Sequence, residues 1–74
     1  MSTLVRTIYL ESEFGVPTDL EAAGTSLENP YAYDSAARDL KSMADQGLVR
    51  IVRQEMHLVG PEPLINHIRF ARLR

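Results

Sequence analysis

Polar side chains recur at helical spacing in the middle of the chain. Arg38 and Lys41 are three residues apart, so a helix would place both on one face. An arginine can donate a pair of hydrogen bonds to guanine, and a lysine can reach a base edge or a phosphate. The candidates for nucleic-acid contacts on this face are Ser35, Arg38, Lys41 and Ser42. In the alternative interpretation the face is only solvated, and its cations pair with Asp34 and Asp45 at i, i+4 spacing.

More cations follow in the last third of the chain. Arg50 and Arg53 fall in one segment of strand-like composition, and Arg69 and Arg72 fall in a second. Exposed arginines on a hairpin could contact a phosphate backbone. They could equally protect the edges of a sheet against pairing with other chains. The sequence leaves both interpretations open.

Histidines and carboxylates offer other chemistry, but no pattern completes a site. His57 and His67 could approach each other across a hairpin near Glu55, yet a structural zinc site normally needs four ligands. Two carboxylate pairs of the kind that acid–base catalysis uses are Glu11 with Glu13 and Asp19 with Glu21. The sequence has no glycine-rich phosphate loop and no nucleophile elbow. We therefore expect that the protein is not an enzyme and that it binds neither a metal nor a cofactor.

The central segment has the signals of a helix over residues 30–46. Asn29 is a favoured N-cap residue, and Pro30 is favoured at the first helical position. Apolar residues then recur at i, i+3, i+4 and i+7, and Gly47 stands where a helix commonly ends. The predicted apolar stripe consists of Tyr33, Ala36, Ala37, Leu40, Met43 and Ala44. Tyr31, outside this stripe, could with Tyr33 mark a surface for a protein partner, because tyrosine is enriched at interfaces.

A β-hairpin is predicted after this helix. Residues 48–59 and 64–73 read as strands, and residues 60–63, with a glycine and two prolines, read as a turn. Alternation predicts one apolar face with Val52, Met56, Leu58, Leu64, Ile68 and Phe70. The opposite face would carry Arg53, Glu55, His57, His67 and Arg69. A slip of one residue in pairing would mix the two faces.

The first 28 residues are expected to support the central helix. Residues 3–14 fit either a helix or a strand, since apolar periodicity favours the former and β-branched residues favour the latter. Thr18 and Glu21 form a capping box, which predicts a short second helix starting at Thr18. Leu27 is the expected buried anchor of the linker that follows.

Length and composition restrict the class of protein. A chain of 74 residues makes one domain with a thin core, which oligomerisation would help to stabilise. The chain has no cysteine, which excludes disulfides and thiolate metal sites. No apolar stretch approaches the roughly 20 residues that span a bilayer, and no signal peptide is evident. We expect a soluble cytoplasmic protein without membrane contact, acidic in its first half and basic in its second.

Residues 40–49, Leu-Lys-Ser-Met-Ala-Asp-Gln-Gly-Leu-Val, resemble a motif of the winged helix-turn-helix regulators of bacteria and phages. The family pattern is Leu-x-x-Leu-x-x-x-Gly-Leu-Val, and Met43 stands at the second leucine. Residues 16–21 are similar to the entry of the family's second helix. The resemblance implies an α+β fold over residues 1–74, with about three helices followed by a two-stranded antiparallel wing. Support helices would lie in 1–28, the recognition helix in 29–47 and the wing in 48–74.

The same resemblance implies a small DNA-binding transcription regulator. Its central helix would enter the major groove of double-stranded DNA, and its wing arginines would hold phosphates. The implied DNA contacts are Ser35, Arg38, Lys41, Ser42, Arg50, Arg53 and Arg69. A homodimer would double these contacts. The alternative is a winged-helix module that binds a protein rather than DNA, which the tyrosines and the acidic first half favour.

Overall fold

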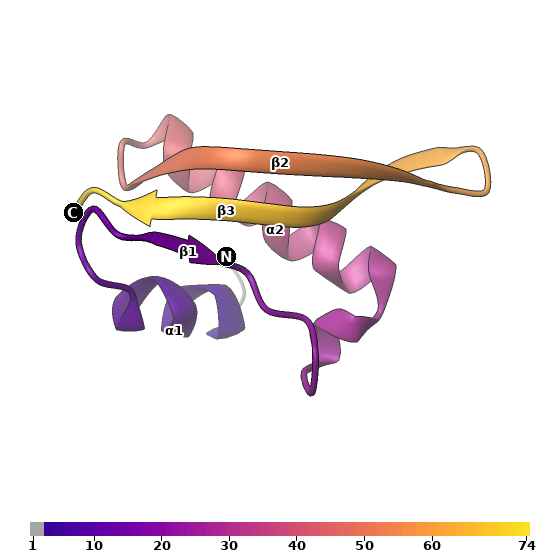
Figure 1. Ribbon diagram of the computed structural model, residues 1–74, viewed down its shortest axis with the longest axis horizontal. Helices are drawn as coiled ribbons and strands as arrows, with labels where there is room; N and C mark the ends of the chain where they lie inside the picture. Colours follow the sequence, from indigo (N-terminus) through magenta and orange to yellow (C-terminus); the bar gives the residue numbers. More distant parts are fainter. Residues whose placement is uncertain (1–2) are drawn as a thin grey trace.

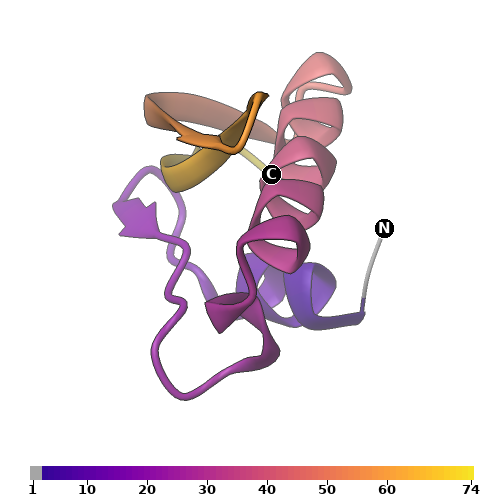
Figure 2. The same ribbon diagram turned by 90° about the vertical axis from the view of Figure 1, so that its right-hand side faces the viewer.

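The computed structural model describes residues 3–74 and shows an α+β fold (Figure 1). In chain order, the elements are α1 (Thr3–Glu11), β1 (Pro17–Asp19), the 3-10 turn η1 (Ser26–Glu28), α2 (Pro30–Asp45), β2 (Val49–Val59) and β3 (Glu62–Arg72). The three strands form an antiparallel sheet in the order β1-β3-β2. Figure 2 shows α2 beside one face of this sheet, with α1 on the side of β1 and away from β2. The α+β class predicted from the sequence is confirmed.

Helix α2 begins at Pro30, as the sequence predicts, and ends at Asp45, one residue before the predicted end. The Asn29 side chain accepts hydrogen bonds from the amides of Tyr31 at 2.9 Å and Ala32 at 3.1 Å. Gly47 adopts a φ of +77° just after the helix, a conformation that glycine takes without a steric penalty. The predicted stripe faces the core, because Tyr33, Ala36, Ala37, Leu40 and Met43 are buried. The core also includes Val5 of α1 and Leu27 of η1, so the prediction for Leu27 is confirmed.

The hairpin is also confirmed, with a tighter turn than predicted. Val59 lies opposite Glu62, so only Gly60 and Pro61 form the turn, and Pro63 already belongs to β3. Gly60 has a φ of +62°, which favours glycine at this position. Figure 1 shows this end of the hairpin extending beyond α2.

The predicted apolar face is right for β3 and wrong for β2. Leu64, Ile68 and Phe70 of β3 are buried. The three predicted β2 members are exposed instead, with exposed fractions of 42% for Val52, 48% for Met56 and 65% for Leu58. Two irregularities shift the pairing, between Ile51 and Arg53 and between Glu55 and Met56. As a result Ile51 takes the position opposite Phe70, and the outer part of β2 has no helix to cover it.

The predicted second helix at Thr18 is wrong, and with it the expectation of three helices and a two-stranded sheet. Pro17–Asp19 forms β1, which pairs with Arg69, Phe70 and Ala71 of β3. The Thr18 hydroxyl donates to the Val16 carbonyl at 3.1 Å rather than capping a helix. The one helical turn in this part is η1, whose cap is Thr25. Pairing with a strand some 50 residues away outweighs a local capping pattern, because it satisfies the backbone and ion-pairs Asp19. Residues 3–14, for which the sequence left helix and strand open, contain α1.

Candidate functional site

The exposed face of α2 carries all four residues that the sequence assigns to it. Ser35, Arg38, Lys41 and Ser42 are exposed, on the side of α2 away from its buried stripe. Helical spacing brings Arg38 next to Ser35, Lys41 and Ser42, so the four form one polar surface. We call these four residues the α2 face.

Arg38 is held in place by a carboxylate that is itself anchored to the sheet. The Arg38 Nε donates to Asp34 Oδ2 at 2.8 Å, and Asp34 Oδ1 accepts from the Ile65 amide of β3 at 2.8 Å. The Asp34 side chain is only 13% exposed, whereas that of Arg38 is 54% exposed. Because the bond to Asp34 uses Nε, the two terminal nitrogens can still donate together to a planar acceptor pair. The sequence predicted Asp34 only as a neutralising partner and gave no sign of its bond to Ile65.

The hydrogen bond from the Arg38 guanidinium holds the pKa of Asp34 below its usual 3.8. Partial burial of the carboxyl acts in the opposite direction, and the hydrogen bond from the Ile65 amide lowers the pKa further. A carboxyl whose pKa is lowered by folding stabilises the fold above its unfolded pKa and loses that effect as pH falls through the folded pKa. We expect stability to fall on acidification below about pH 4. Asp34→Asn keeps an acceptor for Ile65 but loses the charge, so it should be less stable at neutral pH and show a shallower acid dependence. Denaturant melts at stepwise pH would measure both, and parallel wild-type and variant curves would contradict this assignment.

Lys41 and Arg50 are the predicted contact cations that form no salt bridge within the described part of the chain. Both side chains are exposed, and within residues 3–74 neither takes part in an ion pair. Lys41 lies in the second half of α2, and Arg50 lies near the start of β2, close behind that helix in the chain. Both cations are therefore available to a polyanion.

Arg53 and Arg69, by contrast, belong to a charge network on the outer face of the sheet. Arg69 donates to both oxygens of Asp19, from Nε at 2.8 Å and from Nη2 at 3.2 Å. His67 Nε2 lies 3.0 Å from Asp19 Oδ1, and its Nδ1 lies 3.6 Å from Glu55. Arg53 lies 3.2 Å from Glu55. The hydrogen bonds from Arg69 lower the pKa of Asp19. Partial burial acts against this shift, and the hydrogen bond with His67 adds to it.

This network shows which predicted outer-face residues the structure brings together. Arg53 lies opposite Arg69 and Glu55 lies opposite His67, as the predicted face requires, but His57 lies opposite Leu64. The two histidines are therefore not cross-strand partners. Within residues 3–74, no three His, Cys, Asp or Glu side chains are grouped so that they could hold a metal ion.

The Arg72 side chain is held by contacts within the fold. Its guanidinium lies over the rings of Tyr9 and Phe14, 4.6 and 4.3 Å from their centroids. Its Nη1 donates to the carbonyls of Leu10 at 3.1 Å and Ser12 at 3.3 Å, where α1 ends. Arg72 therefore fastens α1 to β3 and is not free to reach a phosphate.

The two tyrosines of α2 differ in exposure, since one is buried and the other is exposed. Tyr33 is 4% exposed, so it cannot contribute to a partner surface as the sequence allowed. Tyr31 is 54% exposed and remains available.

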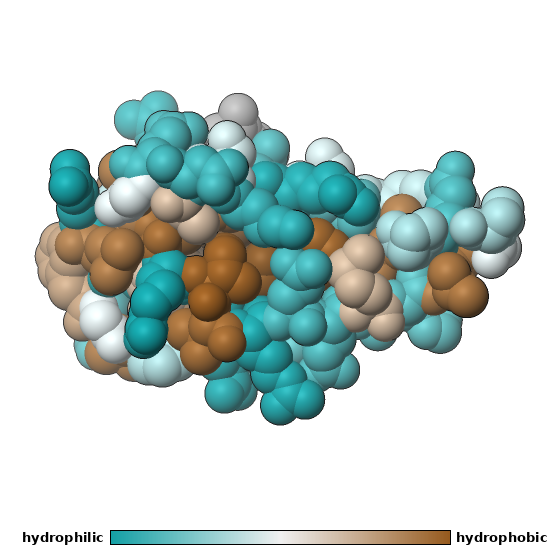
Figure 3. Space-filling view, turned by 90° about the horizontal axis from the view of Figure 1, so that it is seen from above, coloured by the Kyte–Doolittle hydropathy of each residue, from teal (hydrophilic) through white to brown (hydrophobic). Residues whose placement is uncertain are grey.

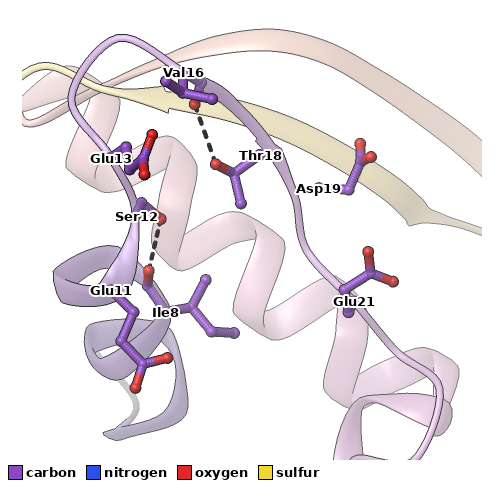
Figure 4. A pocket seen from close by; sticks show the side chains of 8 residues that line it. All are labelled: Ile8, Glu11, Ser12, Glu13, Val16, Thr18, Asp19 and Glu21. Atoms are coloured by element: carbon purple, nitrogen blue, oxygen red, sulfur yellow. Dashed lines mark hydrogen bonds between the residues drawn. The ribbon is translucent and has the colours of Figure 1, made fainter.

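A cavity of about 370 Å³ lies between α1 and β1 and combines both carboxylate pairs (Figure 4). Glu11 and Glu13 come from the end of α1 and the loop after it, while Asp19 and Glu21 come from β1 and the segment beyond it. Ile8 and Val16 supply apolar lining. The sequence placed these pairs on separate elements, and they share one cavity because the chain reverses direction between α1 and β1 (Figure 4). Asp19 is already paired with Arg69, but the carboxylates of Glu11, Glu13 and Glu21 disfavour a phosphate here, which leaves the α2 face as the better surface for a polyanion.

Comparisons with known proteins add no relative. No protein-family model, no curated protein and no solved structure matches the chain. Among the described residues, no helix is both long enough and apolar enough to cross a membrane.

Proposed function

We propose that this chain is a small DNA-binding regulator of the winged-helix kind that presents the α2 face to the major groove of double-stranded DNA. The order of a first helix, a long helix and a hairpin supports it, since the resemblance at residues 40–49 implies a support helix, a recognition helix and a wing in this order. Strand β1 and the turn η1 stand where the resemblance implies a second helix. The observation that carries the proposal is Arg38, exposed and fixed through Nε to the anchored Asp34. A guanidinium oriented in advance loses little conformational freedom when it binds guanine O6 and N7.

The proposal assigns different tasks to the remaining cations. Lys41 and Arg50, which are exposed and unpaired within residues 3–74, contact phosphates. Arg53 and Arg69 contribute less than the sequence suggests, because Glu55 and Asp19 already neutralise them. With about two phosphate contacts in each chain, the logarithm of affinity should fall with the logarithm of salt at a slope of about −2. Ser35 and Ser42 supply neutral hydrogen bonds beside Arg38.

Variants of two cations, Arg38 and Lys41, should behave differently toward DNA. Arg38→Ala should lower affinity for the preferred sequence by about 1–3 kcal/mol and relax the preference at one base pair. Lys41→Ala should weaken all sequences alike and reduce the salt slope by about one. Selection from a random duplex library, followed by fluorescence anisotropy of a labelled winner at several salt concentrations, would measure both effects.

Arg6→Ala is the matched control, because Arg6 is an exposed arginine on α1, outside the α2 face. It should leave affinity, preference and slope unchanged. No detectable duplex binding at low salt, or equal losses in Arg6→Ala and Arg38→Ala, would reject the DNA proposal.

A second candidate is a protein-binding module, favoured by the exposed Tyr31 at the start of α2 and by the neutralised wing arginines. Here Tyr31 serves as an aromatic anchor. Cross-linking from a photoreactive amino acid at position 31 in cells, compared with one at position 6, would separate the two candidates. Recovery of a defined protein adduct from position 31 without duplex binding would support this module over the DNA regulator.

A further inference from the structure

The longer of the two edge strands of the sheet is β2, since the other edge, β1, has only three residues. The strand order β1-β3-β2 leaves one side of β2 without a partner strand within residues 3–74. This edge has 11 residues and exposes Val52, Met56 and Leu58. β2 is the uppermost strand in Figure 1, and the view from above in Figure 3 shows hydrophobic side chains interspersed with hydrophilic ones along the long axis. An exposed, partly apolar edge of this length readily pairs with another strand.

The charges on β2 are complementary to themselves. Arg53 and Glu55 lie on the outer face of the sheet, on either side of Gln54. If two copies of β2 pair antiparallel about a twofold axis at Gln54, Arg53 of each copy lies opposite Glu55 of the other. The same register places Val52 of each copy opposite Met56 of the other. Opposite charges and apolar pairs directly across a ladder both stabilise it.

Neighbouring registers fit less well. A twofold axis at Arg53 or at Glu55 would place two like charges directly opposite each other, which is destabilising. A twofold axis at Met56 would place Arg53 of each copy opposite Val59 of the other, so the arginine would have no carboxylate directly across the ladder. Two irregularities in the pairing of β2 with β3 flank the central segment from Arg53 to Glu55, one at Val52 and one between Glu55 and Met56. The register therefore rests on the pairs of Arg53 with Glu55 rather than on those of Val52 with Met56.

We propose that two copies of this chain associate through antiparallel pairing of their β2 strands, centred on Gln54. The product is a continuous six-stranded sheet in the order β1-β3-β2-β2-β3-β1. A twofold axis perpendicular to the sheet keeps both α2 helices on the same face. This pairing rests on the β2 edge alone and holds whether or not the chain binds DNA.

Two single charge reversals provide the main test. Arg53→Glu places like charges opposite each other in its homodimer, and so does Glu55→Arg, while a mixture of the two variants restores two opposite-charge pairs. Sedimentation equilibrium of the wild-type chain should show a dimer, and each single variant should raise the dissociation constant about tenfold or more. The mixture should recover near wild-type association. Thermal melts by circular dichroism would confirm that each variant folds before association is compared.

The register is tested by cysteine cross-linking, which is simple because the chain has no cysteine of its own. Gln54→Cys should form a disulfide-linked dimer rapidly on mild oxidation, since residues directly opposite in a ladder approach disulfide distance. Ser35→Cys, exposed on α2, is the control for random collision. A monomeric wild-type chain at its highest soluble concentration would overturn the proposal. So would cross-linking at Gln54→Cys no faster than at Ser35→Cys, or mixed charge variants that stay apart.

Discussion

Replacing Tyr33 with phenylalanine should destabilise the protein by about 2–4 kcal/mol, although it removes a single oxygen atom. The hydroxyl donates to the Leu20 carbonyl at 2.7 Å and accepts from the Ile68 amide at 3.1 Å. Burial raises the pKa of the Tyr33 phenol, so the hydroxyl stays protonated and keeps donating. Without it, a buried carbonyl and a buried amide both lose a partner, and each unsatisfied group costs about 1–3 kcal/mol.

This loss is large for a chain of this size. Domains are stable by roughly 0.05–0.15 kcal/mol per residue, so the variant should lose a substantial part of the total. Chemical denaturation followed by circular dichroism would measure the loss as a lower midpoint at unchanged slope. Tyr31→Phe is the matched control, because the Tyr31 side chain is exposed and the loss of its hydroxyl should change stability by less than about 0.5 kcal/mol. Equal midpoints for the two variants would contradict the bridging role of Tyr33.

Truncating Phe70 to alanine should have the largest effect of any change considered, about 3–5 kcal/mol. Phe70 is fully buried on the central strand, with Thr18 of β1 on one side and Ile51 of β2 on the other. Its ring belongs to the core cluster that includes Leu40 and Met43 of α2. Removing it opens a cavity beneath all three strands, which surrounding side chains refill only in part.

The chain offers a second phenylalanine as a control. Phe14 is 65% exposed and lies against the Arg72 guanidinium, so Phe14→Ala should cost no more than about 1 kcal/mol. Thermal unfolding would rank the two variants, and the Phe70→Ala chain should be largely unfolded at moderate temperature. Similar melting temperatures would mean that Phe70 does not anchor the core in solution.

The stability of the fold and the proposed site are linked at Asp34. Its carboxylate joins Arg38 of α2 to the backbone of β3, so a change in the packing of the hairpin on α2 would also reorient Arg38. For this reason Phe70→Ala and Tyr33→Phe are unsuitable for testing DNA contacts. Lys41→Ala and Arg38→Ala remove exposed groups and are suitable.

Local signals determined the central helix and the hairpin. Asn29, Pro30 and the apolar stripe of α2 act through neighbours within four residues, so their effect can be read along the chain. The exposure of the α2 face follows from the same periodicity. The turn at Gly60 likewise depends on a conformation that few residues other than glycine adopt readily.

Tertiary structure alone decided the rest. Thr18 has a capping pattern, yet it lies in β1, because the backbone of β3 offers it hydrogen-bond partners that no local window contains. Val52 is apolar like a core residue, yet it is exposed. An irregularity in strand pairing places Ile51, and not Val52, opposite Phe70. The ion pair of Arg69 with Asp19 and the anchoring of Arg38 through Ile65 also depend on tertiary structure. The sequence determined which cations the protein carries, which helix presents them and the local pair of Arg38 with Asp34. Long-range strand pairing decided that Arg69 is neutralised, because only the pairing of β1 with β3 brings Asp19 to it.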